Sequence, residues 1–151
     1  MFSFREVIDM AIQLEKNAEN FYRAALTKMS TPSLQPVLVC LANEERSHAE
    51  WFERLKRVGK GADGRTQGEE LSGVVLQNLV GDQKFSLGEV DLSKIESTKE
   101  LIELAVEHEK DTIVFYQMLQ SFMDNPETMK ELDGIIAEED QHIKLLLECK
   151  I

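Results

Sequence analysis

The sequence predicts an all-α protein, a four-helix bundle made of two helical hairpins that a long crossover joins. Three observations lead to this fold class. Four segments repeat apolar residues at alternating spacings of three and four, the period of a helix with one buried face. The links inside each pair of segments are short, whereas residues 59–95 separate the pairs. The two halves also match each other at a constant offset, as the halves of a duplicated hairpin would.

The first hairpin comprises the first two periodic segments. A helix is expected from Ser3 to about Met29, and a second from about Leu34 to Val58. The stripe of the first contains Phe4, Ile8, Ala11, Ala18, Tyr22, Ala25 and Met29. The stripe of the second contains Leu38, Leu41, Phe52 and Leu55.

Residues 59–95 form the break between the hairpins. All glycines except Gly134 lie in this segment, and glycine-rich sequence interrupts helices. Within it, Leu71 to Val80 is apolar enough for a short packed helix or strand. We expect this stretch to lie on the bundle or on a partner subunit. The apolar crossover therefore favours a homodimer, in which segments could be exchanged between subunits.

The second hairpin begins at residues 97–100, where Ser-Thr-Lys-Glu fits a capping box. The third helix is expected to run to about Met123, and Asn125 and Pro126 then cap and start the fourth, which runs to the C-terminus. The stripes of the two helices contain Ala105, Thr112, Tyr116 and Leu119, then Leu132, Ile135, Leu146 and Cys149. Short links within pairs and a long link between them are the ferritin-like connectivity of four-helix bundles. We expect one domain over residues 1–151.

Composition and charge exclude several classes of partner. Lys and Arg number 17 against 28 Asp and Glu, and the formal net charge of −11 disfavours nucleic acid and membrane surfaces. No apolar run approaches the roughly 18 residues of a membrane span, and the amphipathic, acidic start is unlike a signal peptide. Cys40 and Cys149 form no Cys-x-x-Cys pair, so a zinc ribbon is excluded. We expect buried or half-buried thiols in a reducing compartment, the cytoplasm.

An offset of 94 residues, which carries Ser3 onto Ser97, superposes the two halves without insertion. On the first and third helices the matched residues are Glu6 and Glu100, Ala11 and Ala105, Glu15 and Glu109, Lys16 and Lys110, and Phe21-Tyr22 and Phe115-Tyr116. On the second and fourth they are Leu38 and Leu132, Glu44-Glu45 and Glu138-Glu139, and His48 and His142. Polar residues that recur at core positions need a reason other than packing.

Six polar residues interrupt the apolar stripes and should point into the core. They are Glu15, Glu45, His48, Glu109, Glu139 and His142. Unpaired buried carboxylates cost several kcal/mol each, so four of them need metal ions or protons. One Glu from each of two helices with Glu-x-x-His from each of the other two is the di-iron or di-manganese arrangement, and the oxygen-rich set suits these metals better than zinc.

We therefore predict two metal ions, iron in the first place and manganese or zinc as alternatives. Glu45 and Glu139 are expected to bridge the two ions. The remaining ligands are expected to divide between them, with Glu15 and His48 on one and Glu109 and His142 on the other.

Neighbouring polar residues leave alternatives open. Glu19 lies one turn after Glu15, but its repeat mate is Ile113, which favours a surface place or one beside the ligands. Glu44 and Glu138 do recur, and their spacing of four to the histidines also fits one helical face. The helical face that carries Glu44 and Glu138 would also carry Val37 and its repeat mate, Glu131. Because Glu131 argues against burial of that face, Glu45 and Glu139 remain the preferred ligands.

The aromatic residues and the remaining histidine are less decisive. Tyr22 and Tyr116 stand two turns from Glu15 and Glu109 on the same face. They are either core tyrosines that need any partner, or they hydrogen-bond the bridging carboxylates or deliver an electron. His108 lies off the seam and is expected to be partly exposed. The single tryptophan, Trp51, and the methionines are expected to pack.

The paired motifs resemble those of the rubrerythrin-type ferritin-like proteins, with Glu-x6-Tyr on the first and third helices and Glu-x-x-His on the second and fourth. The resemblance runs over nearly the whole chain. It implies a non-haem di-iron centre that reduces hydrogen peroxide, and sometimes oxygen, to water. The alternatives are a ferroxidase or small iron store, and a non-catalytic metal-binding bundle.

The sequence departs from that family pattern at two points. The family's longer members carry a rubredoxin domain with four cysteines, so here the electrons are expected from a separate donor protein such as a rubredoxin. Typical rubrerythrins also have a further glutamate where this chain has Thr112. That glutamate takes part in a ligand exchange on redox change, so Thr112 is expected to affect turnover.

Overall fold

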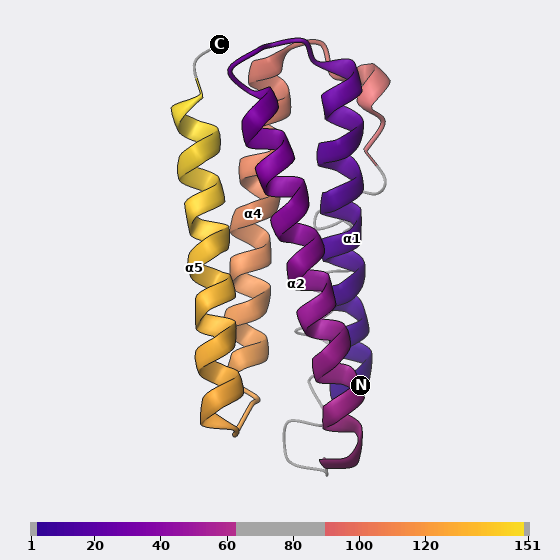
Figure 1. The fold of residues 1–151 in the computed structure, drawn as a ribbon, viewed down its shortest axis with the longest axis vertical. Helices are drawn as coiled ribbons and strands as arrows, with labels where there is room; N and C mark the ends of the chain where they lie inside the picture. The colour runs from indigo at the N-terminus through magenta and orange to yellow at the C-terminus, as the bar shows by residue number, and fades with distance from the viewer. Residues whose placement is uncertain (1–2, 63–89, 150–151) are drawn as a thin grey trace.

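The computed structural model describes residues 3–62 and 90–149 of the chain, and within these ranges all the regular secondary structure is helical, with no strand. The long helices are α1 (Phe4–Lys28), α2 (Gln35–Ala62), α4 (Thr98–Gln120) and α5 (Pro126–Glu148), and the short 3-10 helix η3 (Leu92–Lys94) precedes α4. Helix α1 packs along α2 and α4 along α5, so that each pair is a hairpin (Figure 1). The predicted all-α four-helix bundle is confirmed.

The helices begin where side chains can cap their free backbone N–H groups. Before α1, the Ser3 hydroxyl accepts from the backbone N–H of Glu6 at 3.1 Å, and the Glu6 carboxylate accepts from the N–H of Ser3 at 3.0 Å. Before α4, Ser97 likewise accepts from Glu100, but the Glu100 carboxylate lies 3.5 Å from the N–H of Glu96 instead. The reciprocal capping box is therefore at α1, and only half of the one predicted at residues 97–100 forms.

The helix ends differ from the predicted bounds by a few residues. Helix α2 continues to Ala62, four residues beyond the predicted Val58, because the glycines that follow weaken a helix without ending it. Helix α4 stops at Gln120, and beyond it the N–H groups of Phe122 and Met123 bond carbonyls three residues back instead of four. The apolar stretch 71–80, predicted to lie on the bundle or on a partner, falls outside the described residues.

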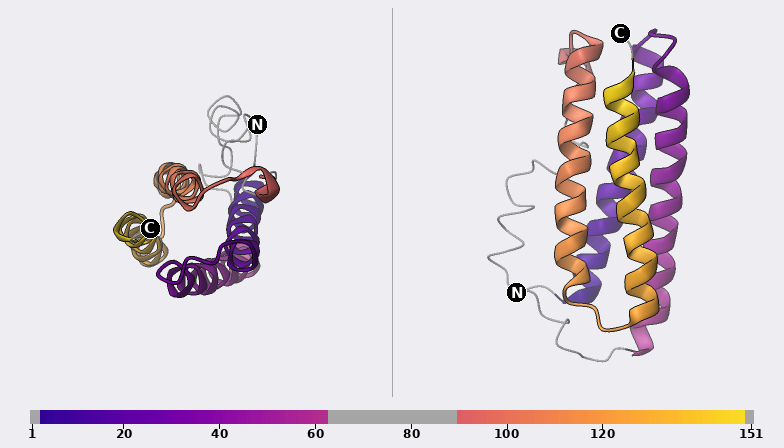
Figure 2. Two further views of the ribbon diagram at one scale, coloured as in Figure 1. Left: turned by 90° about the horizontal axis from the view of Figure 1, so that it is seen from above. Right: turned by 90° about the vertical axis from the view of Figure 1, so that its left-hand side faces the viewer.

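Two apolar clusters fill the bundle at different heights. One includes Tyr22, Leu38 and Leu101, and the other includes Ile8 and Phe52, each with contributions from all four long helices. The two hairpins face each other, with α5 beside α2 (Figure 2). Along every long helix, a short polar stretch separates the residues of one cluster from those of the other.

The remaining features of the described chain are ordinary for a helical bundle. Cys40 and Cys149 are free thiols of intermediate exposure. Trp51 is partly buried against the second apolar cluster, as its sequence position predicted. None of the helices in residues 3–62 and 90–149 has an apolar stretch long enough to cross a membrane.

Candidate metal centre

The six polar residues that interrupt the stripes lie together between the two apolar clusters. Helix α1 contributes Glu15, α2 contributes Glu45 and His48, α4 contributes Glu109, and α5 contributes Glu139 and His142. Each is at most 3% exposed. Helical periodicity places them there, because each falls at the spacing of three or four that directs its apolar neighbours into the same interior.

The six residues form two overlapping groups of four. Within each group, every residue offers one oxygen or nitrogen atom, and these atoms lie within 4.8 Å of one another. The first group is Glu15, Glu45, His48 and Glu139, and the second is Glu45, Glu109, Glu139 and His142. Glu45 and Glu139 belong to both groups, and each group is completed by one further glutamate and one histidine.

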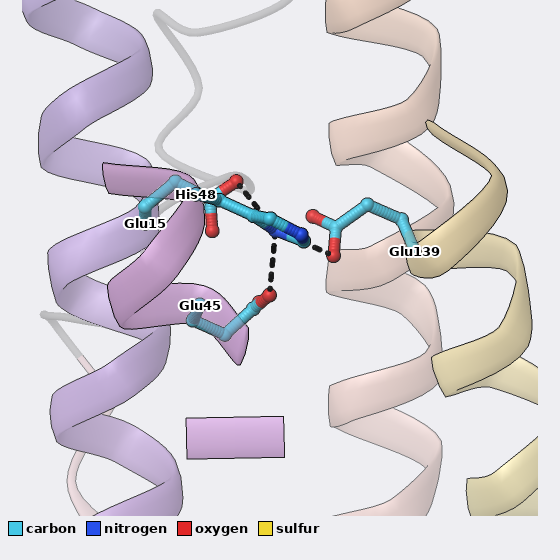
Figure 3. A group of neighbouring side chains, drawn as sticks. All are labelled: Glu15, Glu45, His48 and Glu139. Carbon is cyan, nitrogen blue, oxygen red and sulfur yellow. Dashed lines mark ion pairs between the residues drawn. The ribbon is translucent and has the colours of Figure 1, made fainter. Parts of the chain in front are cut away.

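The imidazole of His48 reaches between carboxylates of both hairpins (Figure 3). Its Nδ1 atom lies 3.6 Å from Glu15, 3.4 Å from Glu45 and 3.5 Å from Glu139. On the other side of the ring, Nε2 lies 2.7 Å from Oε1 of Glu138 on α5. When the imidazole is neutral, the Nε2–H group donates to Glu138 and the lone pair of Nδ1 is directed at the cluster.

His142 repeats this arrangement from the opposite hairpin. Its Nδ1 atom lies 3.5 Å from Glu45, 3.6 Å from Glu109 and 3.1 Å from Glu139. Its Nε2 atom lies 2.8 Å from Oε1 of Glu44 on α2. A carboxylate behind a metal-binding histidine fixes both the ring and the tautomer, so the two rings are held with Nδ1 inward.

Glu44 and Glu138 thus lie behind the histidines and outside the two donor groups. Their side chains are 38% and 56% exposed, whereas Glu45 and Glu139 are fully buried. The sequence did signal them, because both recur in the repeat. Spacing along one helix offered them as alternative ligands on the same face as the histidine of their own helix, but each glutamate contacts the histidine of the other hairpin.

The two tyrosines also bond across the hairpins. The hydroxyl of Tyr22 on α1 donates to Glu109 at 2.7 Å, and that of Tyr116 on α4 donates to Glu15 at 2.5 Å. Of the alternatives left open by the sequence, a hydrogen bond to the carboxylates common to both groups does not form, because each phenol reaches a glutamate that belongs to one group only. Burial and the nearby carboxylates raise the pKa of both tyrosines well above their usual range, which keeps them as donors.

The two carboxylates common to both groups, Glu45 and Glu139, have raised pKa values, which favour the neutral, protonated form of each. Burial, followed by the charges of Glu109 and the other carboxylates, raises the pKa of Glu45 well above its usual range. The same causes raise the pKa of Glu139 to about 8. At Glu109, burial acts upward, but the charge of His142, whose Nδ1 atom lies 3.6 Å away, outweighs it and lowers the pKa. Without a cation, the cluster must therefore hold protons.

The two histidines hold some of these protons. Burial alone would lower their pKa values. The carboxylate of Glu15 nevertheless raises the pKa of His48 to about 10, and Glu109 and Glu139 raise that of His142 to about 11. A cation that binds between the carboxylates would displace these protons, since only the neutral imidazole coordinates a metal.

The cluster contains buried atoms that the protein itself leaves unsatisfied. Both carboxylate oxygens of Glu45 and of Glu139, one oxygen each of Glu15 and Glu109, and Nδ1 of both histidines have no hydrogen-bond partner among the described residues. Buried polar atoms are normally paired, so this set fits cations at two positions. Two divalent ions would neutralise four carboxylates, and oxygen-rich ligands with one imidazole at each position suit iron or manganese.

The other polar residues considered from the sequence lie outside the two groups. Glu19 accepts a hydrogen bond from Arg23 at 2.7 Å. His108 is 2% exposed, so the predicted partial exposure is wrong. Helix α4 buries Leu101, Ile102 and Val106 beside its central stripe, and this wider buried face includes His108.

The comparisons with known proteins identify the family and the fold. The family model for rubrerythrin matches residues 6–150. Among solved structures, a Thermotoga maritima protein described as a ferritin-like diiron-carboxylate protein is 26% identical with a TM-score of 0.74, and the match covers 97% of this chain and 93% of that chain. A hypothetical protein from Pyrococcus furiosus is 22% identical with a TM-score of 0.63, over 99% and 94% of the two chains, and is similar in fold. No curated protein sequence matches the chain.

Proposed function

This chain belongs to the rubrerythrin family, and from that premise we propose that it holds two iron ions and reduces hydrogen peroxide to water, with oxygen as a slower oxidant. The observation that carries the proposal is the pair of overlapping donor groups that share Glu45 and Glu139. These two carboxylates would bridge the ions. Glu15 and His48 would complete one position, and Glu109 and His142 the other.

The bound ions would supply the two electrons that cleave an O–O bond. The chain would position the ligands, exclude water from the site and deliver protons. The apolar clusters above and below the site exclude bulk water. Glu44 and Glu138 orient the imidazoles, and the phenols of Tyr22 and Tyr116 hold the glutamates they contact.

Reducing one peroxide to two waters also consumes two protons. We propose that the two tyrosine–glutamate pairs relay them from solvent, so that each phenol regains the proton that it passes on. The Tyr116 hydroxyl proton lies in a 2.5 Å hydrogen bond to Glu15, and the Tyr22 proton lies in a 2.7 Å bond to Glu109. Each proton is thus held at a phenol oxygen, beside a carboxylate that can accept it and pass it on.

The electrons would come from a separate donor protein. The sequence has two cysteines, both free and on different hairpins, and this number is too small for a four-cysteine iron site. We propose a small one-electron carrier such as a rubredoxin, with the chain acting in the cytoplasm.

Anaerobic loading with ferrous iron, followed by stopped-flow mixing with peroxide or with oxygen, tests this function. We expect oxidation by peroxide to be the faster reaction, a reductant to restore the ferrous form for repeated turnover, and no iron to accumulate beyond the two-ion site. Glu50→Gln is a suitable control, because Glu50 is half-exposed on α2, outside the two donor groups, and its ion pair is with Arg46 on the same helix. Faster oxidation by oxygen, or dozens of irons retained per chain, would assign the protein to ferroxidase activity or storage.

A further inference from the structure

A line of aromatic rings runs from the edge of the bundle to the carboxylate cluster. Trp51, partly buried on α2, has its ring centroid 5.0 Å from that of Phe52 at an interplanar angle of 79°. Phe52 is fully buried, and its centroid lies 5.1 Å from that of Tyr116. The Tyr116 hydroxyl in turn donates to Oε2 of Glu15. Continuous ring contact therefore joins an accessible indole to a residue of the cluster.

Each oxidisable end of this line has a carboxylate that can receive its proton. The indole N–H of Trp51 donates to Oε1 of Glu131 at 3.1 Å on the exposed side of the bundle. At the other end, Glu15 accepts from the Tyr116 phenol. Loss of an electron makes an indole or a phenol strongly acidic, so a base already in hydrogen-bond contact makes that loss easier. Phe52 carries no such proton and only fills the space between the two.

The line exists in one half of the duplicated bundle. At the repeat offset, Trp51 and Phe52 correspond to Leu145 and Leu146. The corresponding tyrosine, Tyr22, keeps its hydrogen bond to a cluster glutamate, but its ring contact is with Phe21, at 5.5 Å. Leucines thus fill the equivalent space in the other half, so packing alone does not require the aromatic residues.

We propose that Trp51, Phe52 and Tyr116 carry single electrons from the protein surface to the cluster. The proposal rests on the proposed function for its direction, because peroxide reduction needs electrons to enter a site that is buried from solvent. The reductant is a one-electron carrier that meets the protein at Trp51.

Electrons and protons balance along this path. Tyr116 gives one electron to the oxidised site and its phenol proton to Glu15. An electron from Trp51 then crosses the Phe52 contact and restores Tyr116, which takes its proton back from Glu15, while the indole proton moves to Glu131. The external carrier finally returns one electron to Trp51, and the indole regains its proton from Glu131.

The composition allows a site-selective test, since Trp51 is the single tryptophan and Tyr22 and Tyr116 are the two tyrosines. The full chain is oxidised at the indole by a laser-flash ruthenium photosensitiser with a sacrificial acceptor. Transient absorption then follows the exchange of the radical between the indole and the phenol until their ratio is constant. The rate of this relaxation is the sum of the transfer rates in the two directions, and the final ratio of phenoxyl to indolyl radical separates them. The flash is applied with added zinc, which exchanges no electrons, and without added metal.

We expect the phenoxyl radical to form in the parent protein and in Tyr22→Phe, and to be lost in Tyr116→Phe. Phe52→Leu, which installs the residue of the other half, should slow the transfer severalfold. Phe21→Leu is its matched control and should leave the rate unchanged. Circular dichroism checks the fold of each variant. If Phe52→Leu does not fold, the two isosteric tyrosine variants still decide the question.

Retention of the phenoxyl radical in Tyr116→Phe, its loss in Tyr22→Phe, or no transfer in the parent protein would overturn the proposed path. These readouts require neither iron nor peroxide. A chain that binds no metal, or that reduces no peroxide, would therefore refute the proposed function without altering the result of this experiment.

Discussion

Glu44 and Glu45 are consecutive residues on α2, yet they lie on different sides of a histidine. One residue turns a helix by about 100°, so the pair cannot share a face. Glu45 points into the interior between the two donor groups, and Glu44 reaches around to Nε2 of His142. The same division separates Glu138 from Glu139 on α5. The sequence Glu-Glu-x-x-His thus provides two carboxylates with different roles. Its second glutamate is a buried ligand candidate, and its first orients the imidazole of the opposite hairpin.

Removing the orienting carboxylates should weaken metal binding without removing any proposed ligand. Glu44→Gln and Glu138→Gln are each expected to lower ferrous affinity by about 10- to 100-fold, the usual effect of losing a hydrogen-bond partner behind a histidine ligand. Competition with a coloured chelator measures the affinity. Glu50→Gln, on the same helix as Glu44, should bind iron like the parent protein. Equal affinities in all three variants would show that Glu44 and Glu138 are ordinary surface residues.

The metal-free protein should lose stability as pH rises from about 5 to 10. Folding raises the pKa of Glu139 from about 4.5 to about 8, so the folded chain holds a proton that the unfolded chain has released. His48 acts in the same direction, since its stabilising contribution is complete below about 6.5 and is lost as pH rises through about 10. With chelator present, the Glu139 contribution alone should make Tm roughly 10 °C lower near pH 8.5 than near pH 5.5, taking about 1.4 kcal/mol per pKa unit and about 3 °C per kcal/mol, and His48 should add to this fall.

The variant Glu139→Gln is the control for this pH dependence. The amide cannot titrate, so the fall in Tm of the chelated protein should become shallower, leaving the histidines and the general repulsion within an acidic chain. A Tm of the chelated parent protein that rises with pH across this range would contradict the burial of these carboxylates against one another.

Thr112 offers a test at the position where typical rubrerythrins carry a glutamate. Its side chain is 1% exposed and lies one turn after His108, to whose backbone carbonyl its hydroxyl donates at 2.9 Å. Thr112→Glu should increase the rate of peroxide reduction by the iron-loaded protein, because it supplies a carboxylate for ligand exchange. Thr112→Ser keeps the hydroxyl and should keep the parent rate. A folded, iron-loaded Thr112→Glu protein with an unchanged rate would remove this position from the account of turnover.

At the scale of the elements, most of the structure follows from local rules in the sequence. Apolar spacing predicted all four long helices. The starts of three of them also follow from capping residues, because Ser3, Ser97 and Asn125 all accept the expected backbone hydrogen bond. Helix ends were less predictable, since Ala62 and Gln120 carry no strong stop signal. The burial of His108 was missed for a related reason, because a stripe of regular spacing does not show how wide the buried face is.

The cap of α5 should contribute measurably to folding. Asn125 accepts from the backbone N–H of Thr128 at 3.0 Å, so Asn125→Ala should lower the free energy of unfolding by about 1 kcal/mol. Urea denaturation of the metal-free protein at constant pH measures it. Asn125→Asp should retain most of the stability, and Ser47→Ala, at an exposed position within α2, should stay within about 0.5 kcal/mol of the parent. An Asn125→Ala protein as stable as the parent would show that the cap is replaced by solvent.

At the scale of the molecule, the duplication explains why the site could be located from the sequence. Two copies of one hairpin supply equivalent ligand candidates, and facing copies bring them to one centre. The contacts between the copies could not be predicted in the same way. Tyr22 bonds Glu109, and His142 bonds Glu44, and these pairings depend on how the hairpins face each other. A spacing along one chain segment carries no information about that arrangement.

The central claim is that six residues from both hairpins hold two metal ions. Anaerobic titration of the metal-free protein with ferrous iron, followed by equilibrium dialysis and metal analysis, tests it most directly. We expect about two iron ions per chain in the parent protein. The amount of bound iron should fall clearly in Glu45→Ala and in Glu139→Ala, because each carboxylate belongs to both donor groups. It should be unchanged in Glu19→Ala. One ion per chain, or equal losses in Glu19→Ala and Glu45→Ala, would contradict the claim.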